Sequence, residues 1–144
     1  MNVDILTHEK SISKTRARMA IADCDIHPSP KSVEIEIFPF LSKRWQEYMK
    51  TYGVIYRQGF PTGPAFPKGQ PNAARRDSYP TSGGKPGSDL AFMQSQHLGP
   101  NNIQLGVLNP LQCAQGVQNQ DFSAAYCNAV NQWQIEQWLS LIHI

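Results

Sequence analysis

The sequence has few cysteines, a small net charge and no long apolar run. Its 144 residues include three cysteines, an odd number without C-x-x-C spacing, so neither a disulfide framework nor a zinc knuckle is indicated. This cysteine usage fits a reducing, cytoplasmic location. The net charge of +2 predicts no nucleic-acid partner. No apolar stretch reaches membrane-spanning length, and residues 1–18 lack the apolar core of a signal peptide, so we expect no membrane attachment.

The sequence divides into an N-terminal arm, a body and a C-terminal tail. Residues 1–18 are polar with little periodicity, which predicts a flexible N-terminal arm. Residues 19–138 alternate apolar segments with Gly/Pro breaks and suit one domain. Within them, residues 58–88 are dense in glycine and proline with interleaved aromatics, which indicates a packed loop that could cover a site.

The apolar spacing in the body predicts strands and helices that alternate along the chain. Short apolar runs indicate buried strands, strict alternation a half-exposed strand, and a 3.6-residue stripe a helix. Gly53 would end the first helix, Ser88 or Asp89 would cap the second, and Asp121 would cap the third. We expect an α/β fold with parallel strands, made of strands at 19–27, 32–38 and 103–108, and helices at 39–49, 88–97 and 122–138.

Asp25 and His27 are the candidate site residues. They lie two residues apart at the end of the first predicted strand, so both side chains point to one face and can reach one cation. Cys24 would point to the opposite face and serve as a small core residue. The competing interpretation makes Asp25 a strand-end cap and His27 a hydrogen-bonded histidine.

Residues 22–28 read Ala-Asp-Cys-Asp-Ile-His-Pro, and further characteristic segments follow in order at 40–45, 87–89, 107–111 and 129–133. Together these segments, over residues 19–138, resemble the amidohydrolase-related family, which contains metal-dependent hydrolases and nonoxidative decarboxylases. Residues 22–28 are similar to the family's first-strand Asp/His-x-His motif.

The resemblance implies the N-terminal part of a TIM-like (β/α)8 barrel, incomplete in this chain. It also implies a divalent metal, with zinc as the preferred candidate, at the C-terminal end of the barrel strands. Asp25 and His27 match the first-strand metal ligands. The family's later histidine and aspartate have no counterpart here, so catalytic residues are expected beyond residue 138 and the chain alone is expected to be inactive. A small carboxylated or cyclic organic substrate is implied, with hydrolysis and decarboxylation both open. A homo-oligomeric full-length protein is compatible with the family.

The last six residues carry a separate expectation. Leu-Ser-Leu-Ile-His-Ile at 139–144 resembles a translation of the transposase mosaic-end adapter used in sequencing libraries. We therefore expect residues 139–144 to derive from the adapter and the native reading frame to continue past Trp138. The alternative is an ordinary apolar helix end. If the tail is native, we expect a different function. The chain would then be a small non-enzymatic binding module that uses the 58–88 loop for recognition and has no metal affinity.

Overall fold

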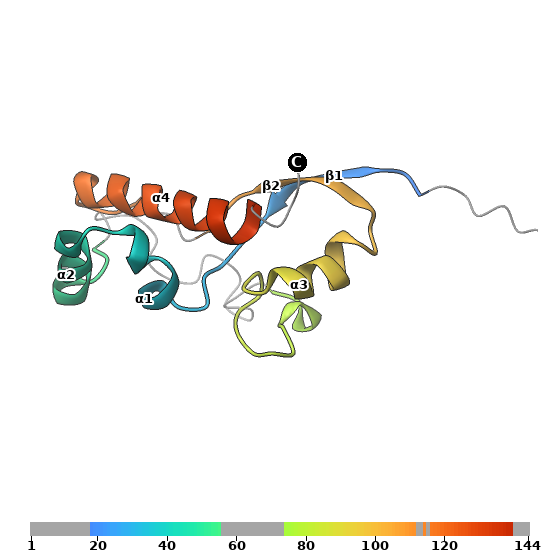
Figure 1. The fold of residues 1–144 in the computed structure, drawn as a ribbon, viewed down its shortest axis with the longest axis horizontal. Helices are drawn as coiled ribbons and strands as arrows, with labels where there is room; N and C mark the ends of the chain where they lie inside the picture. Colours follow the sequence, from blue (N-terminus) through green and yellow to red (C-terminus); the bar gives the residue numbers. More distant parts are fainter. Residues whose placement is uncertain (1–17, 56–73, 112–113, 115, 140–144) are drawn as a thin grey trace, which may run out of the picture.

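A computed structural model describes residues 18–55, 74–111, 114 and 116–139 of the chain (Figure 1). In this part the chain forms a small mixed α/β unit. The elements are, in order, β1 (Ile21–Ile26), α1 (Val33–Glu36), η1 (Phe38–Phe40), α2 (Lys43–Tyr52), η2 (Arg76–Ser78), α3 (Leu90–Met93), η3 (Gln94–Leu98), β2 (Ile103–Leu108), α4 (Gln120–Gln134) and η4 (Ile135–Leu139). η1 and η2 are 3-10 helices, and η3 and η4 are π-helical turns that continue α3 and α4.

The two predicted apolar strands exist and pair in parallel. Ile21 pairs with Ile103 at one end of the ladder, and Ile26 pairs with Leu108 at the other. The carboxyl ends of β1 and β2 therefore lie together, as expected for parallel neighbours. This pairing confirms that the chain is α/β with parallel strands.

The expectation that these strands are buried is wrong. The side chains of Leu105 and Val107 on β2 are 62% and 49% exposed, and Ile21 on β1 is 43% exposed. Cys24 is exposed as well, so its predicted place in the core is wrong. The physical reason is that burial of a parallel strand requires layers on both faces of the sheet. In the described residues most of β1 and β2 has no such cover.

The predicted N-terminal part of a (β/α)8 barrel is also wrong for the described chain. The sheet there has two strands, β1 and β2, and no barrel is present. A barrel closes only when eight tilted strands bring the last strand back to the first. Here the hydrogen-bond ladder stops after one pair of strands, and both outer edges stay open.

The predicted strand at 32–38 is a helical segment instead, made of α1 and η1. Ser32 caps α1 because its side-chain oxygen accepts a hydrogen bond from the backbone N–H of Ile35. The helical turns bury Ile37 and Phe38, which lie next to each other in the sequence. Over seven residues an alternating pattern can fit either structure, and here the cap and the burial of two adjacent side chains favour the helix.

The three predicted helices are present, with one cap corrected. α2 ends at Gly53, whose φ of 66° is readily reached by glycine. Asp89 caps α3, because its carboxylate accepts the N–H of Phe92 at 2.9 Å. The cap of α4 is Asn119 rather than Asp121, since Phe122 N–H donates to the Asn119 side chain at 3.0 Å.

The hydrophobic core lies between α4 and the segment formed by α1, η1 and α2, which runs along one side of α4 (Figure 1). Phe122 on α4 is fully buried at its centre. The ring of Phe122 contacts Trp45 at 5.6 Å and Tyr48 at 5.0 Å between centroids, both from α2, and Tyr126 at 5.8 Å. Tilted aromatic pairs at these distances add to the free energy gained by burial.

Several sequence predictions fall on residues outside the described part of the chain. Residues 1–17 of the predicted arm and residues 140–144 of the predicted tail lie outside it. So do residues 56–73, which include the first half of the predicted loop at 58–88. Among the helices that the structure does describe, none combines the length and the apolar character needed to cross a membrane.

The core predicts a large difference between two single substitutions. Phe122→Ala should lower the free energy of unfolding by about 3–5 kcal/mol, because it empties a fully buried ring site. Ile35→Ala is the matched control, since that side chain is 76% exposed and its loss should change stability by less than about 0.5 kcal/mol. Urea denaturation followed by circular dichroism measures both, and equal losses would contradict this placement of the core.

Candidate functional site

The site lies where β1 and β2 end. Asp25 is near the end of β1, and His27 follows directly after Ile26, its last residue. The backbone N–H of Asn109, just after β2, donates to the carbonyl oxygen of Ile26 at 2.7 Å. This hydrogen bond extends the ladder by one step and brings Asn109 beside the Asp25–His27 pair.

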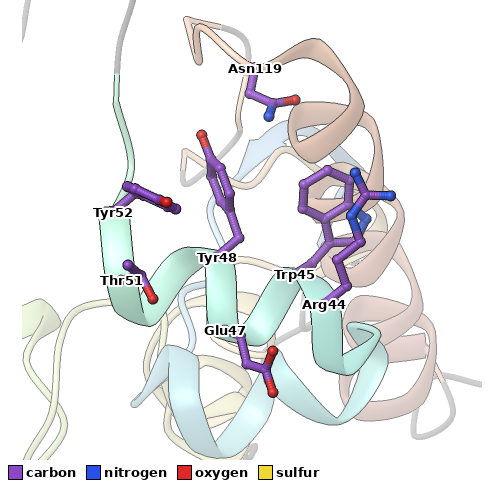
Figure 2. Close-up of a pocket in the computed structure, with 7 residues that line it drawn as sticks. All are labelled: Arg44, Trp45, Glu47, Tyr48, Thr51, Tyr52 and Asn119. Atoms are coloured by element: carbon purple, nitrogen blue, oxygen red, sulfur yellow. The ribbon is translucent and has the colours of Figure 1, made fainter.

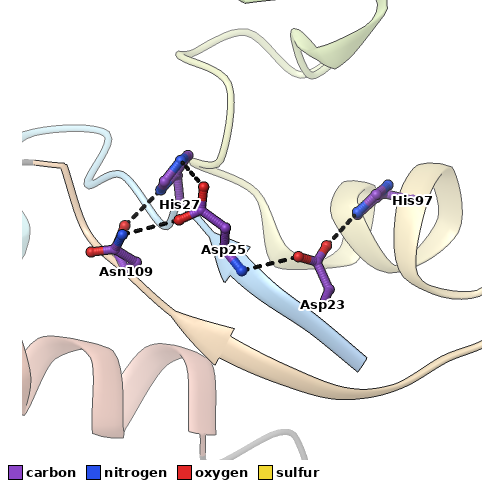
Figure 3. Close-up of polar contacts among 5 residues, drawn as sticks. All are labelled: Asp23, Asp25, His27, His97 and Asn109. Atoms are coloured by element: carbon purple, nitrogen blue, oxygen red, sulfur yellow. Dashed lines mark hydrogen bonds and ion pairs between the residues drawn. The ribbon is translucent and has the colours of Figure 1, made fainter. Parts of the chain in front are cut away.

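Asp25, His27 and Asn109 form a closed triangle of polar contacts (Figure 3). Nδ1 of His27 lies 2.7 Å from the backbone carbonyl oxygen of Asn109. The side-chain amide of Asn109 donates to Oδ1 of Asp25 at 3.0 Å. Nε2 of His27 lies 3.4 Å from Oδ2 of Asp25. Asn109 thus orients both candidate ligands, through its carbonyl on one side and its amide on the other.

The contacts of His27 determine which ring nitrogen carries a proton in the neutral imidazole. A carbonyl oxygen can only accept, so Nδ1 must be the protonated nitrogen that donates to Asn109. Nε2 then carries a lone pair, and that lone pair faces the carboxylate oxygen of Asp25. Two acceptors facing each other at 3.4 Å repel unless a proton or a cation lies between them.

A second Asp–His pair, Asp23 with His97, has the opposite arrangement (Figure 3). Nε2 of His97 lies 2.9 Å from Oδ2 of Asp23. The side-chain nitrogen of Asn101 donates to the carbonyl of His97 and also lies 3.3 Å from its Nδ1. Nδ1 is therefore the acceptor, and Nε2–H of the neutral ring donates to Asp23. This pair is a satisfied hydrogen bond and needs no cation.

Asp23 also supports the first pair through the backbone. Its Oδ1 accepts the N–H of Asp25 at 3.1 Å, so His97, Asp23 and Asp25 form one chain of hydrogen bonds. The hydrogen bond from His97, and after it the one from the Asp25 N–H, holds the pKa of the Asp23 carboxyl below its ordinary value of 3.8. The carboxylate of Asp23 is thereby kept ionised and in place.

The backbone around His27 is held by a turn from the loop before α3. Ser29 N–H donates to the carbonyl of Gly87 at 2.8 Å. Gly87 has a φ of 77°, and a Cβ at this position would lie 2.1 Å from the carbonyl oxygen of His27. Only glycine allows this close approach, so the turn at Gly87 fixes the chain where it leaves the site.

The structure brings Asp25 and His27 together, as the spacing predicted, at a position open to solvent. Their side chains are 67% and 37% exposed. Within the described ranges, no group of three or more His, Cys, Asp or Glu side chains could hold a metal ion. Asp25 and His27 are therefore two candidate ligands without a third His, Cys, Asp or Glu grouped with them in the described residues.

Sequence reasoning missed three residues of this site, Asn109, Asp23 and His97. Asn109 carried a usable signal, because it follows the second parallel strand just as His27 follows the first. His97 lies near the end of η3. Its contact with Asp23 joins positions 74 residues apart in the sequence, and no local sequence pattern predicts such a contact.

The Asp23–His97 hydrogen bond predicts a specific acid dependence of stability. A lowered carboxyl pKa contributes stability that is complete above 3.8 and is lost as the pH falls through the lowered value. In Asp23→Asn the amide oxygen can still accept from His97 but does not titrate, so its stability should fall less between pH 5 and about pH 2. Urea denaturation across this range tests the prediction. Superimposable acid profiles for the variant and the wild type would contradict it.

No protein-family model matches the chain, and a search of curated proteins finds no match. The contacts of Asp25, His27 and Asn109 are therefore the basis on which a function is proposed.

Proposed function

We propose that Asp25 and His27 are two ligands of a divalent metal in an enzyme of the amidohydrolase type. Zinc is the preferred candidate for this metal. The enzyme acts as a hydrolase or nonoxidative decarboxylase on a small carboxylated or cyclic organic substrate. One observation carries the metal assignment. Nε2 of His27 lies 3.4 Å from Oδ2 of Asp25, and Nδ1 lies 2.7 Å from the carbonyl oxygen of Asn109, so a neutral His27 protonated at Nδ1 presents a lone pair toward the carboxylate.

The donor set and its spacing fit such an ion. Two ligands about 2.1 Å from a tetrahedral zinc ion lie roughly 3.4 Å apart, and Nε2 of His27 lies 3.4 Å from Oδ2 of Asp25. Histidine ligands of metals usually donate their other ring N–H to a carbonyl or carboxylate, as Nδ1 of His27 does to Asn109. The remaining ligands would come from groups other than His, Cys, Asp and Glu of the described residues.

Each residue has a defined role in this proposal. Asp25 supplies negative charge and His27 a neutral nitrogen lone pair. Asn109 sets the orientation of both, because it contacts one through its amide and the other through its carbonyl. Asp23 holds the backbone of Asp25. A divalent ion bound here supplies Lewis acidity, which polarises oxygen atoms of a substrate or of water.

A cytoplasmic location belongs to the same proposal. Cys24 is an exposed free thiol and Cys127 a half-buried one. Free thiols persist where the cell keeps them reduced, which is the cytosol in most organisms.

The proposal predicts that zinc binding by the chain depends on Asp25 and His27. Titration of the full chain with Zn²⁺ should show one site whose affinity falls by tenfold or more in His27→Ala and in Asp25→Ala, since each variant removes half of the protein ligands. Competition with a chromogenic chelator measures the affinity directly.

His97→Gln is the matched control for this experiment. It removes a different histidine, while the glutamine amide can still donate to Asp23, so zinc affinity should stay within about twofold. Equal zinc affinity in the wild type and both ligand variants would contradict the proposal, and so would the absence of binding to the wild type.

A further inference from the structure

β2 has an open edge and exposed apolar side chains in the described part of the chain. β1 pairs along one edge of β2, and no described strand pairs along the other (Figure 1). Leu105 and Val107 on this strand are 62% and 49% exposed. An edge strand with unpaired backbone N–H and C=O groups and apolar side chains can serve as a template for one more strand. The metal proposal uses no residue of β2.

The two faces of β2 differ in what covers them. Leu108 packs against the hydrophobic core. Gly106 faces Ile26, since a Cβ at Gly106 would lie 2.5 Å from Cδ1 of Ile26. Alternation along the strand places Leu105 and Val107 on the opposite face, where they stay exposed. A further protein contact through β2 would therefore use its free edge and this outer face.

Charge distinguishes the free edge of β2 from that of β1. The strand Ile103–Leu108 carries no charged side chain. β1 carries two carboxylates, Asp23 and Asp25. Charged side chains on an edge strand oppose pairing with a further strand, and two copies of β1 side by side would bring like charges together. The edge of β2 lacks this protection.

The exposed aromatic side chains on α2 differ from β2 because they contact one another (Figure 2). Trp45 and Tyr48 meet with centroids 5.6 Å apart, and Tyr48 and Tyr52 at 5.2 Å. The guanidinium of Arg44 lies over the ring of Trp45 at 4.6 Å. These side chains already have partners within the chain, whereas the free edge of β2 has none among the described strands.

We propose that the free edge of β2 pairs with β2 of a second copy of this chain, antiparallel and about a two-fold axis at Leu105. In this register Leu105 lies opposite Leu105 of the second copy, and Ile103 lies opposite Val107 on both sides of the axis. Directly opposed apolar side chains of this kind stabilise a pair of strands. The strand is thus complementary to itself, and this favours a second copy over an unrelated partner.

Such a pairing closes at two copies. A two-fold interface uses the same edge of both chains, so no free edge of β2 remains. The resulting four-stranded sheet has β1 at each outer edge, where Asp23 and Asp25 oppose the addition of further strands. The proposal therefore predicts a dimer and not a growing filament.

Sedimentation equilibrium of the full chain between about 1 and 100 µM tests the proposal, and the data should fit a monomer–dimer equilibrium. Leu105→Lys should weaken dimerisation at least about tenfold, because it places two like charges opposite each other on the axis. Ile35→Lys is the matched control, since that side chain is 76% exposed and lies on α1, outside the sheet. It should leave the dimerisation constant unchanged.

Cross-linking tests the register. In a chain whose three cysteines are replaced by serine, Leu105→Cys should form an intermolecular disulfide on mild oxidation. Residues directly opposite in an antiparallel pair have Cα atoms about 4.5–5.5 Å apart, which a disulfide can bridge. Gln104→Cys is the control. It would lie opposite Gly106, so the two introduced thiols would belong to residues more than about 7 Å apart and should stay unlinked on a non-reducing gel.

Four outcomes would overturn the proposal. The first is the monomer mass at every concentration up to about 100 µM. The second is equal dimerisation of Leu105→Lys and the wild type, with both showing the same circular dichroism spectrum. The third is a series of oligomers that grows beyond two copies. The fourth is equal cross-linking at positions 104 and 105, which would contradict the register.

Discussion

The parallel pairing of β1 and β2 is the interaction on which the candidate site depends. Asp25 and His27 belong to one segment and are close by covalent geometry alone, but Asn109 follows His27 by 82 residues in the sequence. The hydrogen bond from Asn109 N–H to the carbonyl of Ile26 brings it to the same edge of the sheet. If this ladder opened, His27 would lose the acceptor that sets its tautomer and Asp25 would lose the amide donor. The site would then be two exposed side chains with no fixed orientation.

The two Asp–His pairs differ in the second partner of each imidazole, and this difference separates a structural contact from a candidate ligand pair. Both pairs involve β1, and both place an imidazole nitrogen near a carboxylate oxygen, at 2.9 Å and 3.4 Å. Their second partners differ, because His97 receives an amide donor from Asn101 while His27 faces a carbonyl acceptor from Asn109. The first arrangement directs a proton at Asp23. When His27 is neutral, the second directs a lone pair at Asp25, an arrangement that suits a proton or a cation between the two groups.

The helical half and the sheet half of the unit differ in how well they are buried. α4 and the segment from α1 to α2 enclose a continuous core around Phe122. The sheet contributes Ile26 to the buried residues and exposes Leu105 and Val107. The solvent-open position of Asp25 and His27 is a consequence of this division.

The sequence by itself determined the local features. It predicted both parallel strands, the three helices, the end of α2 at Gly53 and a cap of α3 at Ser88 or Asp89, because each depends on neighbouring residues and short-range hydrogen bonds. It also identified Asp25 and His27, since two positions of one extended segment share a face in any fold.

Tertiary structure decided what depends on distant partners. Residues 32–38 became helical because Ile37 and Phe38 are both buried, the described sheet stopped at two strands and formed no barrel, and Asn109 and His97 reached the site across separations of 82 and 74 residues. Such contacts form when a chain segment far along the sequence lowers the free energy of the whole, a property that no short pattern contains.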